Sequence, residues 1–286
     1  MSPTTLFTLP IPSTGGTITC TNPPPLPPSP TSKRELDVKK IYILTFISPP
    51  DNRLTPIFIK TFLLALDILE HRYPKGVVIT TSGIGKFYSN GLDLELAMAT
   101  EGFFERDLWG LFRRLITYPM PTIALLNGHA FAGGLMLAMY HDYRVMNPTR
   151  GYLCLNEIEF GVPLQTPMMS IFKEKLPATA LRDLVLEAKR VGGNDALSIG
   201  LVDAVGGVKE VLEFVGGRGL EGKAQSGIYG VMKEEMYRGV LGGIDGHKGN
   251  LEWREGVEER KGVLDGEARE RVEGWERERE NGKAKL

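Results

Sequence analysis

The stretch PTIALLNGHAFAGGLMLAMYHDYRVM, residues 121–146, decides the fold. It overlaps the segment 115–141, which contains no Asp, Glu, Lys or Arg and is long enough to cross a bilayer. Pro119, Pro121 and the glycine pair at 133–134 interrupt this segment. We therefore predict a buried strand, a polar turn and a buried helix instead of a membrane span, followed by a strand at YRVMN.

Similar apolar runs precede this stretch. KKIYILTFIS (39–48) and GVVITTS (76–82) predict buried strands, and 103–118 predicts an amphipathic helix. Residues 55–73 predict another helix, with Thr55 as N-cap and Pro56 as its first residue. Strands that alternate with helices are typical of parallel β-α units covered on both faces, so the expected class is α/β.

The two ends of the chain differ from this core in composition. Residues 1–37 form a Pro-rich lead, in which FTLPI and GTITCT predict short edge strands around a proline run that excludes helix. Residues 38–215 form the core, and 216–286 a C-terminal region that becomes strongly charged from 248. That charged part fits either an exposed helix or a solvated, partly disordered tail.

Charge and cysteine content exclude several classes of protein. The chain has 286 residues with 34 Lys and Arg against 35 Asp and Glu, a balance that argues against a general nucleic-acid binder. Cys20 and Cys154 are the two cysteines, and with no C-x-x-C pair we expect no zinc site. The N-terminus lacks the basic and apolar regions of a signal peptide.

Two loops have the composition of an anion-binding site. SNGLDL (89–94) and NGHAFAGGLMLAM (127–139) each follow a predicted strand and open a predicted helix, which leaves backbone N–H groups without helical partners. Gly133 and Gly134 allow a ligand to approach the backbone closely. One N–H from each loop, converging on one oxygen, would form an oxyanion hole. Each loop alone is equally compatible with simple turn geometry.

A third motif, CLNEIEFGVPL (154–164), places Glu157 and Glu159 among apolar residues. If it is extended, the two side chains share a face. A carboxylate in apolar surroundings has a raised pKa and can act as acid or base, although a surface salt bridge is the alternative. For His129 we expect a structural hydrogen bond, and for His141 a protonated ring at the negative end of the predicted helix.

The glycine loops match neither a P-loop nor a G-x-G-x-x-G fingerprint, so they imply no nucleotide cofactor. Ser89 does not lie in a G-x-S-x-G elbow, which argues against a serine hydrolase.

Together, KFYSNGLDL, PTIALLNGHAFAGGLMLAMYHDYRVM and LNEIEFGVP resemble the crotonase superfamily of enoyl-CoA hydratases and isomerases. The nearest resemblance is to the peroxisomal Δ3,Δ2-enoyl-CoA isomerases of plants and fungi, over residues 38–215. It implies a spiral of β-β-α units, a C-terminal helical region used in trimer contacts, and a homotrimer or hexamer. It also implies an acyl-CoA substrate, no cofactor and no metal. The implied site has an oxyanion hole of the Leu92 and Gly133 N–H groups and substrate-binding residues Ser89, Asn90, Gly91, Asp93 and Gly134.

The same resemblance favours one reaction. Hydratases of the family use two glutamates; here the first position is Met136 and the second is Glu157. Water addition benefits from two carboxylates, whereas moving a double bond needs one base, so an isomerase acting on 3-enoyl-CoA through Glu157 is expected. A hydratase that uses Glu157 and Glu159, and a non-catalytic CoA-thioester-binding subunit, are the alternatives. Arg53 is a candidate for contacting the CoA phosphates.

The last three residues, Ala284, Lys285 and Leu286, resemble the S-K-L peroxisomal address. They predict peroxisomal localisation and recognition by an import receptor.

Overall fold

The computed structural model describes residues 2–25 and 36–283 and divides into two compact units, Met1–Ile244 and Asp245–Leu286. In the described ranges, every strand belongs to the first unit. The terminal tripeptide at 284–286 and most of the proline run lie outside the described residues.

The first unit is built on a seven-stranded sheet with the order β1-β2-β3-β4-β6-β8-β10. The first three strands pair antiparallel and the rest pair parallel. Both predicted N-terminal strands form, but only β1 is an edge, because β2 pairs with β3. The bounds are β1 Thr4–Ile11, β2 Gly16–Asn22, β3 Ile41–Ile47, β4 Val77–Ser82, β6 Thr122–Leu126, β8 Tyr143–Met146 and β10 Ala204–Val205.

A second, three-stranded parallel sheet consists of β5 (Phe87–Ser89), β7 (His129–Phe131) and β9 (Leu153–Cys154), in that order. Each of these short strands follows a strand of the large sheet and precedes a helical segment. The chain therefore repeats a β-β-α unit, which confirms the predicted spiral.

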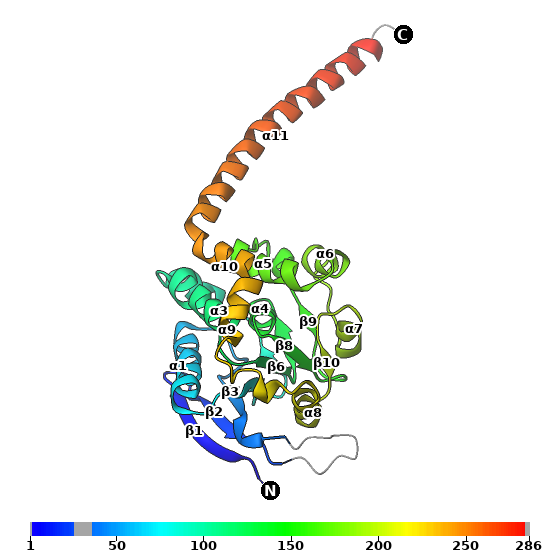
Figure 1. Cartoon of the computed structure of the whole chain (residues 1–286). Helices are drawn as coiled ribbons and strands as arrows, with labels where there is room; N and C mark the ends of the chain where they lie inside the picture. Colours follow the sequence, from blue (N-terminus) through cyan, green and yellow to red (C-terminus); the bar gives the residue numbers. More distant parts are fainter. Residues whose placement is uncertain (1, 26–35, 284–286) are drawn as a thin grey trace. The chain divides into compact units, whose positions relative to one another are not determined.

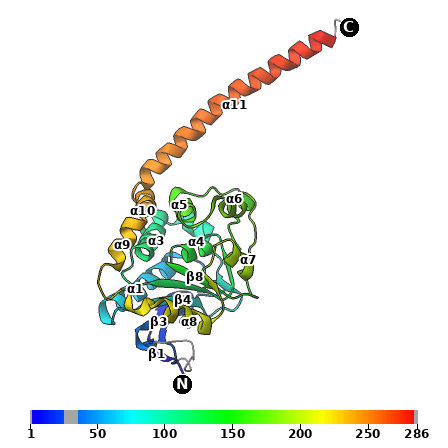
Figure 2. The same cartoon turned by 45° about the vertical axis from the view of Figure 1, so that its right-hand side comes forward.

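Helices cover both faces of the large sheet, as predicted (Figures 1 and 2). Tyr42, Leu44 and Phe46 of β3 face one cluster of buried side chains, with α1 (Pro56–Arg72), α3 (Trp109–Ile116) and α4 (Gly133–Met139). Ile41 and Ile43 face the opposite cluster, with α8 (Val208–Arg218). This alternation follows from the two-residue period of a strand.

The remaining helical segments mostly agree with the sequence predictions. Thr55 caps α1, accepting a hydrogen bond from Phe58 N, and Pro56 is the first helical residue. The helix predicted over 103–118 begins as a π-helix before α3. In the described residues, no helix is long and apolar enough to span a membrane. The other segments are η1 Val38–Lys40, α2 Leu94–Ala99, η2 Phe103–Leu108, η3 Glu157–Phe160, α5 Thr166–Lys175, α6 Ala178–Leu186, α7 Gly193–Ser198, η4 Leu220–Gly222, α9 Tyr229–Met236, α10 Arg238–Asp245 and α11 His247–Lys283.

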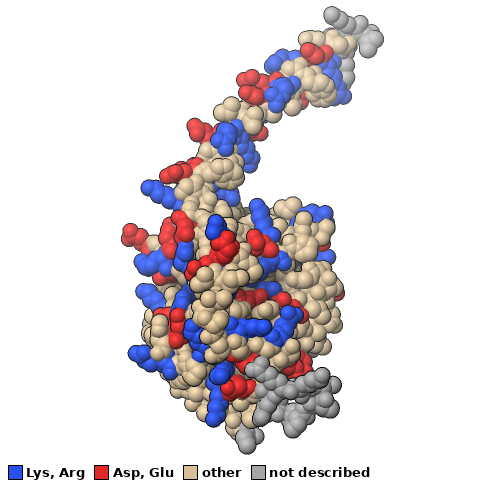
Figure 3. Space-filling view, viewed as in Figure 1, with Lys and Arg blue, Asp and Glu red and all other residues tan. Residues whose placement is uncertain are grey.

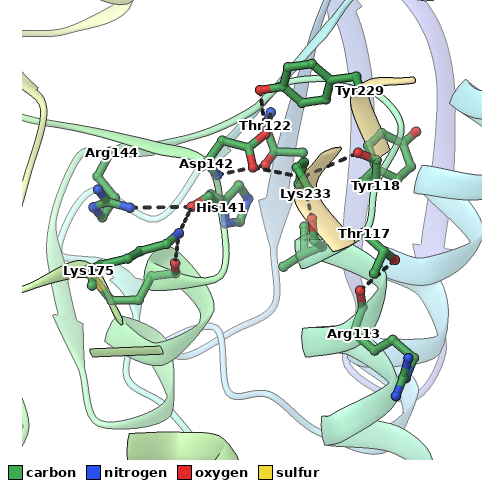
Figure 4. Close-up of polar contacts among 12 residues, drawn as sticks. Arg113, Thr117, Tyr118, Thr122, His141, Asp142, Arg144, Lys175, Tyr229 and Lys233 are labelled. Carbon is green, nitrogen blue, oxygen red and sulfur yellow. Dashed lines mark hydrogen bonds and ion pairs between the residues drawn. The ribbon is translucent and has the colours of Figure 1, made fainter. Parts of the chain in front are cut away.

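A buried ion pair between Lys233 of α9 and Asp142, the residue before β8, connects α9 with the large sheet (Figure 4). Asp142 Oδ1 lies 2.8 Å from Lys233 Nζ, and its Oδ2 accepts hydrogen bonds from Thr122 N and Tyr229 OH at 2.9 and 3.2 Å. Lys233 also donates to the carbonyl oxygen of Leu115 at 2.9 Å. Burial lowers the pKa of Lys233, and Asp142 opposes that shift.

His141 is not protonated at the end of α4, contrary to the sequence expectation. Its Nδ1 donates to the Leu137 carbonyl at 2.9 Å, so Nε2 accepts from the hydroxyl of Thr80, also at 2.9 Å. Burial lowers the pKa of His141 to about 3. Lys175 instead contacts this end of the helix: its Nζ donates to the carbonyl oxygens of Met139 and His141 at 2.6 and 2.7 Å, and burial lowers the pKa of Lys175 well below its ordinary value (Figure 4).

We predict that Lys233→Met lowers the free energy of unfolding by about 3–5 kcal/mol, since it leaves Asp142 buried without its cation. The control is Lys209→Met, which removes an exposed pair with Glu213 and should change the free energy by less than about 0.5 kcal/mol. Denaturant titration measures both. Equal small losses in the two variants would contradict a structural role for the Asp142–Lys233 pair.

Candidate active site

The small sheet brings the three sequence motifs together. Ser89 at the end of β5 pairs with Ala130 of β7, and Phe131 of β7 pairs with Cys154 of β9. One residue further on, Ala132 N donates to the carbonyl oxygen of Cys154 at 2.9 Å. Because parallel strands end at the same edge of a sheet, the loops that follow β5, β7 and β9 lie beside one another.

The two predicted oxyanion-hole residues, Leu92 and Gly133, are in close contact. A Cβ atom on Gly133 would lie 3.3 Å from Leu92 N, and one on Gly91 would lie 2.9 Å from Gly133 N. Gly91 has φ +82°, a conformation that suits glycine. Across the described ranges, no protein acceptor takes the N–H of Leu92 or Gly133. Both donors are therefore available to a ligand.

Each of these N–H groups belongs to a peptide whose carbonyl accepts a hydrogen bond. The Gly91 carbonyl, in the same peptide as Leu92 N, accepts from Leu54 N at 2.8 Å. The Ala132 carbonyl, in the same peptide as Gly133 N, accepts from Met136 N at 3.0 Å. A bonded carbonyl polarises its peptide and strengthens the N–H as a donor.

The entrance to α4 is a strained, closely packed turn. Ala132 has φ 49° and ψ −124°, outside the regions that an L-residue prefers, and its N–H is held by Cys154. A Cβ on Gly134 would come 2.2 Å from the Ser89 carbonyl oxygen, so α4 packs directly against the end of β5. Strain of this kind is found where the surrounding structure holds a functional geometry.

Ser89 and Asp93, predicted as substrate-binding residues, use their side chains within the protein. The hydroxyl of Ser89 is buried; it donates to the Asn52 carbonyl at 2.7 Å and accepts from Gly91 N at 3.2 Å. Asp93 caps α2 by accepting from Leu96 N at 3.1 Å. These bonds shape the loop, and direct contact of residues 89–93 or of Gly134 with a ligand stays a prediction.

Asp51 and Arg53 support the loop 89–93 through hydrogen bonds that the sequence did not predict. Asp51 accepts from the side chain of Asn90 at 2.6 Å and lies 3.1 Å from Arg53 Nε. Arg53 also donates to the Leu92 carbonyl at 2.7 Å. Arg53, considered for the CoA phosphates, is thus bound to the loop that carries Leu92. The available signal was the polar run DNR, residues 51–53, which follows β3 after Ser48 and two prolines.

Glu157 and Glu159 do not share a face. The condition for a shared face, an extended motif, is not met, because Glu157–Phe160 is a 3-10 helix, which separates residues two apart. Glu159 is exposed, whereas Glu157 is half-buried and, in the part of the chain described, its Oε2 is buried without a hydrogen-bond partner. Burial raises the pKa of Glu157 to about 7. Such a carboxyl can accept and return a proton at neutral pH.

Two other side-chain oxygens in residues 156–165 are also buried without a partner. Asn156 Oδ1 precedes Glu157, Gln165 Oε1 lies at the start of α5, and neither atom has a partner among residues 2–25 and 36–283. Buried acceptors normally have donors, so each of these three oxygens could accept from a ligand or a water. Sequence analysis missed both residues, whose only signal was a polar side chain in an apolar motif.

The other two residues considered for chemistry have different surroundings. Met136 is buried in α4, whose sequence GGLMLAM has no ionisable side chain. His129 Nδ1 accepts from Tyr152 N at 3.1 Å, which confirms a structural hydrogen bond. Burial, together with Lys86 and Arg190, lowers the pKa of His129.

Comparison with known proteins identifies the class of enzyme. The family model described as enoyl-CoA hydratase/isomerase matches residues 38–216. The chain belongs to this family. It is 33% identical over 225 residues to enoyl-CoA delta isomerase 3 of Arabidopsis thaliana, covering 74% of this chain and 94% of that protein. It is 34% identical over 212 residues to the plant's enoyl-CoA delta isomerase 1, peroxisomal, covering 71% and 88%.

Solved structures share the fold. A probable enoyl-CoA hydratase of Mycobacterium tuberculosis has a TM-score of 0.66 at 22% identity, covering 80% of this chain and 97% of that one. An enoyl-CoA hydratase/isomerase family protein from Pseudomonas syringae has a TM-score of 0.65 at 25% identity, covering 76% and 94%. The two-sheet spiral is thus the fold of the family.

We predict that Glu157→Gln is more stable than the natural chain at pH 8, and that the gap closes toward pH 4.5. The pKa of Glu157 is about 7 in the folded protein and 4.5 in the unfolded chain. As the pH rises, the unfolded chain therefore loses this proton at a lower pH than the folded protein does. The natural chain therefore loses stability as pH rises from about 4.5 to about 7, and the variant lacks this loss. Thermal unfolding across this range measures the gap; Glu159→Gln is the control. A gap independent of pH would show that Glu157 is not held protonated by burial.

Proposed function

We propose that the protein is a Δ3,Δ2-enoyl-CoA isomerase, which converts a 3-enoyl-CoA into the trans-2-enoyl-CoA. The observation that carries this proposal is the carboxyl group of Glu157, whose Oε2 is buried without a hydrogen-bond partner. It follows Cys154, whose carbonyl oxygen accepts from Ala132 N, next to the available N–H groups of Gly133 and Leu92. The similarity to plant proteins named enoyl-CoA delta isomerases supports it.

In the proposed reaction, the thioester carbonyl oxygen accepts hydrogen bonds from Leu92 N and Gly133 N. Glu157 removes a proton from C2, and the electron pair of that C–H bond moves toward the carbonyl, giving a dienolate. The N-terminal end of α4 and the two N–H groups stabilise this negative charge. Glu157 then returns the proton to C4, which leaves the double bond between C2 and C3. No atom is gained or lost, so one carboxyl is sufficient.

The loop 89–93 and Gly134 form the proposed substrate-binding edge. Ser89, Asn90 and Asp93 have side-chain hydrogen bonds within the protein, so their proposed role is to present backbone groups to the thioester. The hydrogen-bond donors that Asn156 and Gln165 lack would come from the substrate or from bound water.

Hydration is supported less well. Glu159, the candidate for a second carboxylate, is exposed, and α4 presents the apolar Met136 where hydratases of the family have a glutamate. A non-catalytic CoA-thioester-binding subunit would not need a carboxyl whose pKa is raised to about 7.

We expect Glu157→Gln to lower the turnover of 3-enoyl-CoA by about 10²-fold or more, because the amide cannot accept a proton. Glu159→Gln is the matched control, two residues away and exposed, and should stay within about twofold. Steady-state rates with one 3-enoyl-CoA measure both. A Glu157→Gln variant with near-normal turnover would overturn the proposed base.

We expect Met136→Glu to gain hydratase activity toward a 2-enoyl-CoA, because it restores the carboxylate that hydratases carry in this helix. Met136 is 1% exposed, so the variant is also expected to be less stable, by several kcal/mol. Circular dichroism identifies the folded protein, and loss of 2-enoyl absorbance measures hydration. A folded variant that hydrates no faster than the natural chain would show that Met136 does not select the reaction.

We also propose that the protein acts in the peroxisome. Two of the plant relatives are named peroxisomal, which supports this location. An N-terminal fluorescent fusion should co-localise with a peroxisomal marker, and deletion of Leu286 should make it diffuse, because the import receptor reads the terminal tripeptide. Diffuse fluorescence of both fusions would contradict the proposal.

For the compact unit we propose a homotrimer or a pair of trimers. Ile228 and the α9 residues Val231, Met232 and Met236 are exposed large apolar side chains, which supports burial against another copy. Sedimentation of a 31.6 kDa monomer at micromolar concentration would contradict it.

A further inference from the structure

The long helix α11 carries an apolar stripe with an eleven-residue repeat. Trp253, Leu264 and Trp275 are spaced eleven residues apart, as are Val257 and Ala268. Eleven residues make three turns at about 3.67 residues per turn, close to the natural period of an α-helix. The repeat therefore stays on one side of the helix over its length. We call these five residues, together with Val272, which lies three residues before Trp275, the α11 stripe: Trp253, Val257, Leu264, Ala268, Val272 and Trp275.

The α11 stripe is exposed on a helix that is weak by itself. Trp253, Leu264 and Trp275 are 64%, 61% and 56% exposed. The 37 residues of α11 include six glycines, and each glycine destabilises a helix relative to alanine. Helices of this kind gain most of their stability by packing an apolar face.

The charges on α11 favour another protein helix as the occupant of the stripe. The helix has nine Lys and Arg against eleven Asp and Glu, and the two signs are interspersed along it (Figure 3). A helix that lies on an anionic membrane or on nucleic acid would need a predominantly basic face. A balanced helix can instead pair with a copy of itself.

We propose that α11 binds α11 of a second copy of this chain, antiparallel, with Leu264 at the two-fold axis. In this register Trp253 lies opposite Trp275 of the second copy, because both are eleven residues from Leu264. The contact between Trp253 and Trp275 is then made twice, once on each side of the axis. The two copies of Leu264 meet on the axis itself. An isologous pair of this type closes on itself and does not form fibres.

Around Leu264, charge complementarity favours the antiparallel orientation. Arg260 and Lys261 lie just before Leu264, whereas Asp265 and Glu267 lie just after it. A parallel pair would place the cations of one helix beside the same cations of the other. Reversing one helix places these cations beside the acids. Within each helix the acids already pair with Arg269 and Arg271 one turn on, so the contact would extend an existing network.

The pairing is independent of the proposed reaction and of the proposed trimer. It would join two monomers into a dimer, or two trimers into a hexamer. In either case, loss of the α11 contact halves the mass of the particle. A mass measurement therefore tests the pairing proposal separately from the isomerase proposal, which is tested by activity.

The mass test uses two neighbouring residues in the full chain. Leu264→Gln removes the centre of the stripe, and Val263→Gln changes a residue that is also 61% exposed but points elsewhere on the helix. Light scattering after size exclusion should give half the natural mass for Leu264→Gln and the natural mass for Val263→Gln. Equal masses for the natural chain and Leu264→Gln would overturn the proposal.

Disulfide cross-linking tests the orientation. Trp253→Cys and Trp275→Cys should each fail to cross-link alone, because the two copies of either cysteine are about 33 Å apart at 1.5 Å per residue. A mixture of the two variants, or Leu264→Cys alone, should give a covalent dimer on mild oxidation. The natural Cys20 and Cys154 are buried and present in every sample. Cross-linking of Trp253→Cys alone would show a parallel pair, and no cross-link in any sample would overturn the pairing.

Discussion

The site depends on the pairing of three short parallel strands, β5, β7 and β9. These strands, which end at Ser89, Phe131 and Cys154, place the three loops that follow them at one edge. The hydrogen bond from Ala132 N to the Cys154 carbonyl extends that pairing beyond the strands and holds the strained turn that starts α4. Gly134, packed against the Ser89 carbonyl, then leaves Gly133 N beside Leu92 N. Local backbone geometry, more than any single side chain, therefore builds the pair of donors.

The polarity of α4 connects this edge with the rest of the core. Its N-terminal end provides the Gly133 N–H, and its C-terminal carbonyls are bonded by Lys175. Between them the helix is wholly apolar and includes Met136. Burial raises the pKa of Glu157 toward neutrality, and a hydrogen bond from its own backbone N–H only partly opposes that shift. That setting suits a group that must both remove and return a proton.

The sequence predicted the elements whose signal is local. Continuous apolar runs marked β3, β4 and β6, and Thr55 with Pro56 marked the start of α1. Tertiary contacts decided the rest. The position of β2 inside the sheet depends on its pairing with β3, and the neutral form of His141 depends on burial next to Thr80. The 3-10 turn at Glu157 could not be distinguished by sequence from an extended segment.

Within the site, the two loops and Glu157 were predictable from a recognisable order of motifs. Asp51 and Arg53 were not, because their contribution is made through hydrogen bonds to a loop about 40 residues away. In the sequence, residues 248–286 showed only alternating charge. The apolar stripe became apparent once the structure showed one continuous helix, which places the eleven-residue repeat on a single face. An eleven-residue spacing of apolar residues predicts a common face only when the segment is known to be helical.

The central claim is that this site moves a double bond and does not add water. Ultraviolet absorbance of the conjugated enoyl thioester tests it with two substrates and the same protein sample. With a 3-enoyl-CoA, the account predicts that absorbance rises as the conjugated 2-enoyl product forms. With a 2-enoyl-CoA, it predicts little loss of absorbance. No rise with the first substrate and a rapid fall with the second would contradict the account and identify a hydratase.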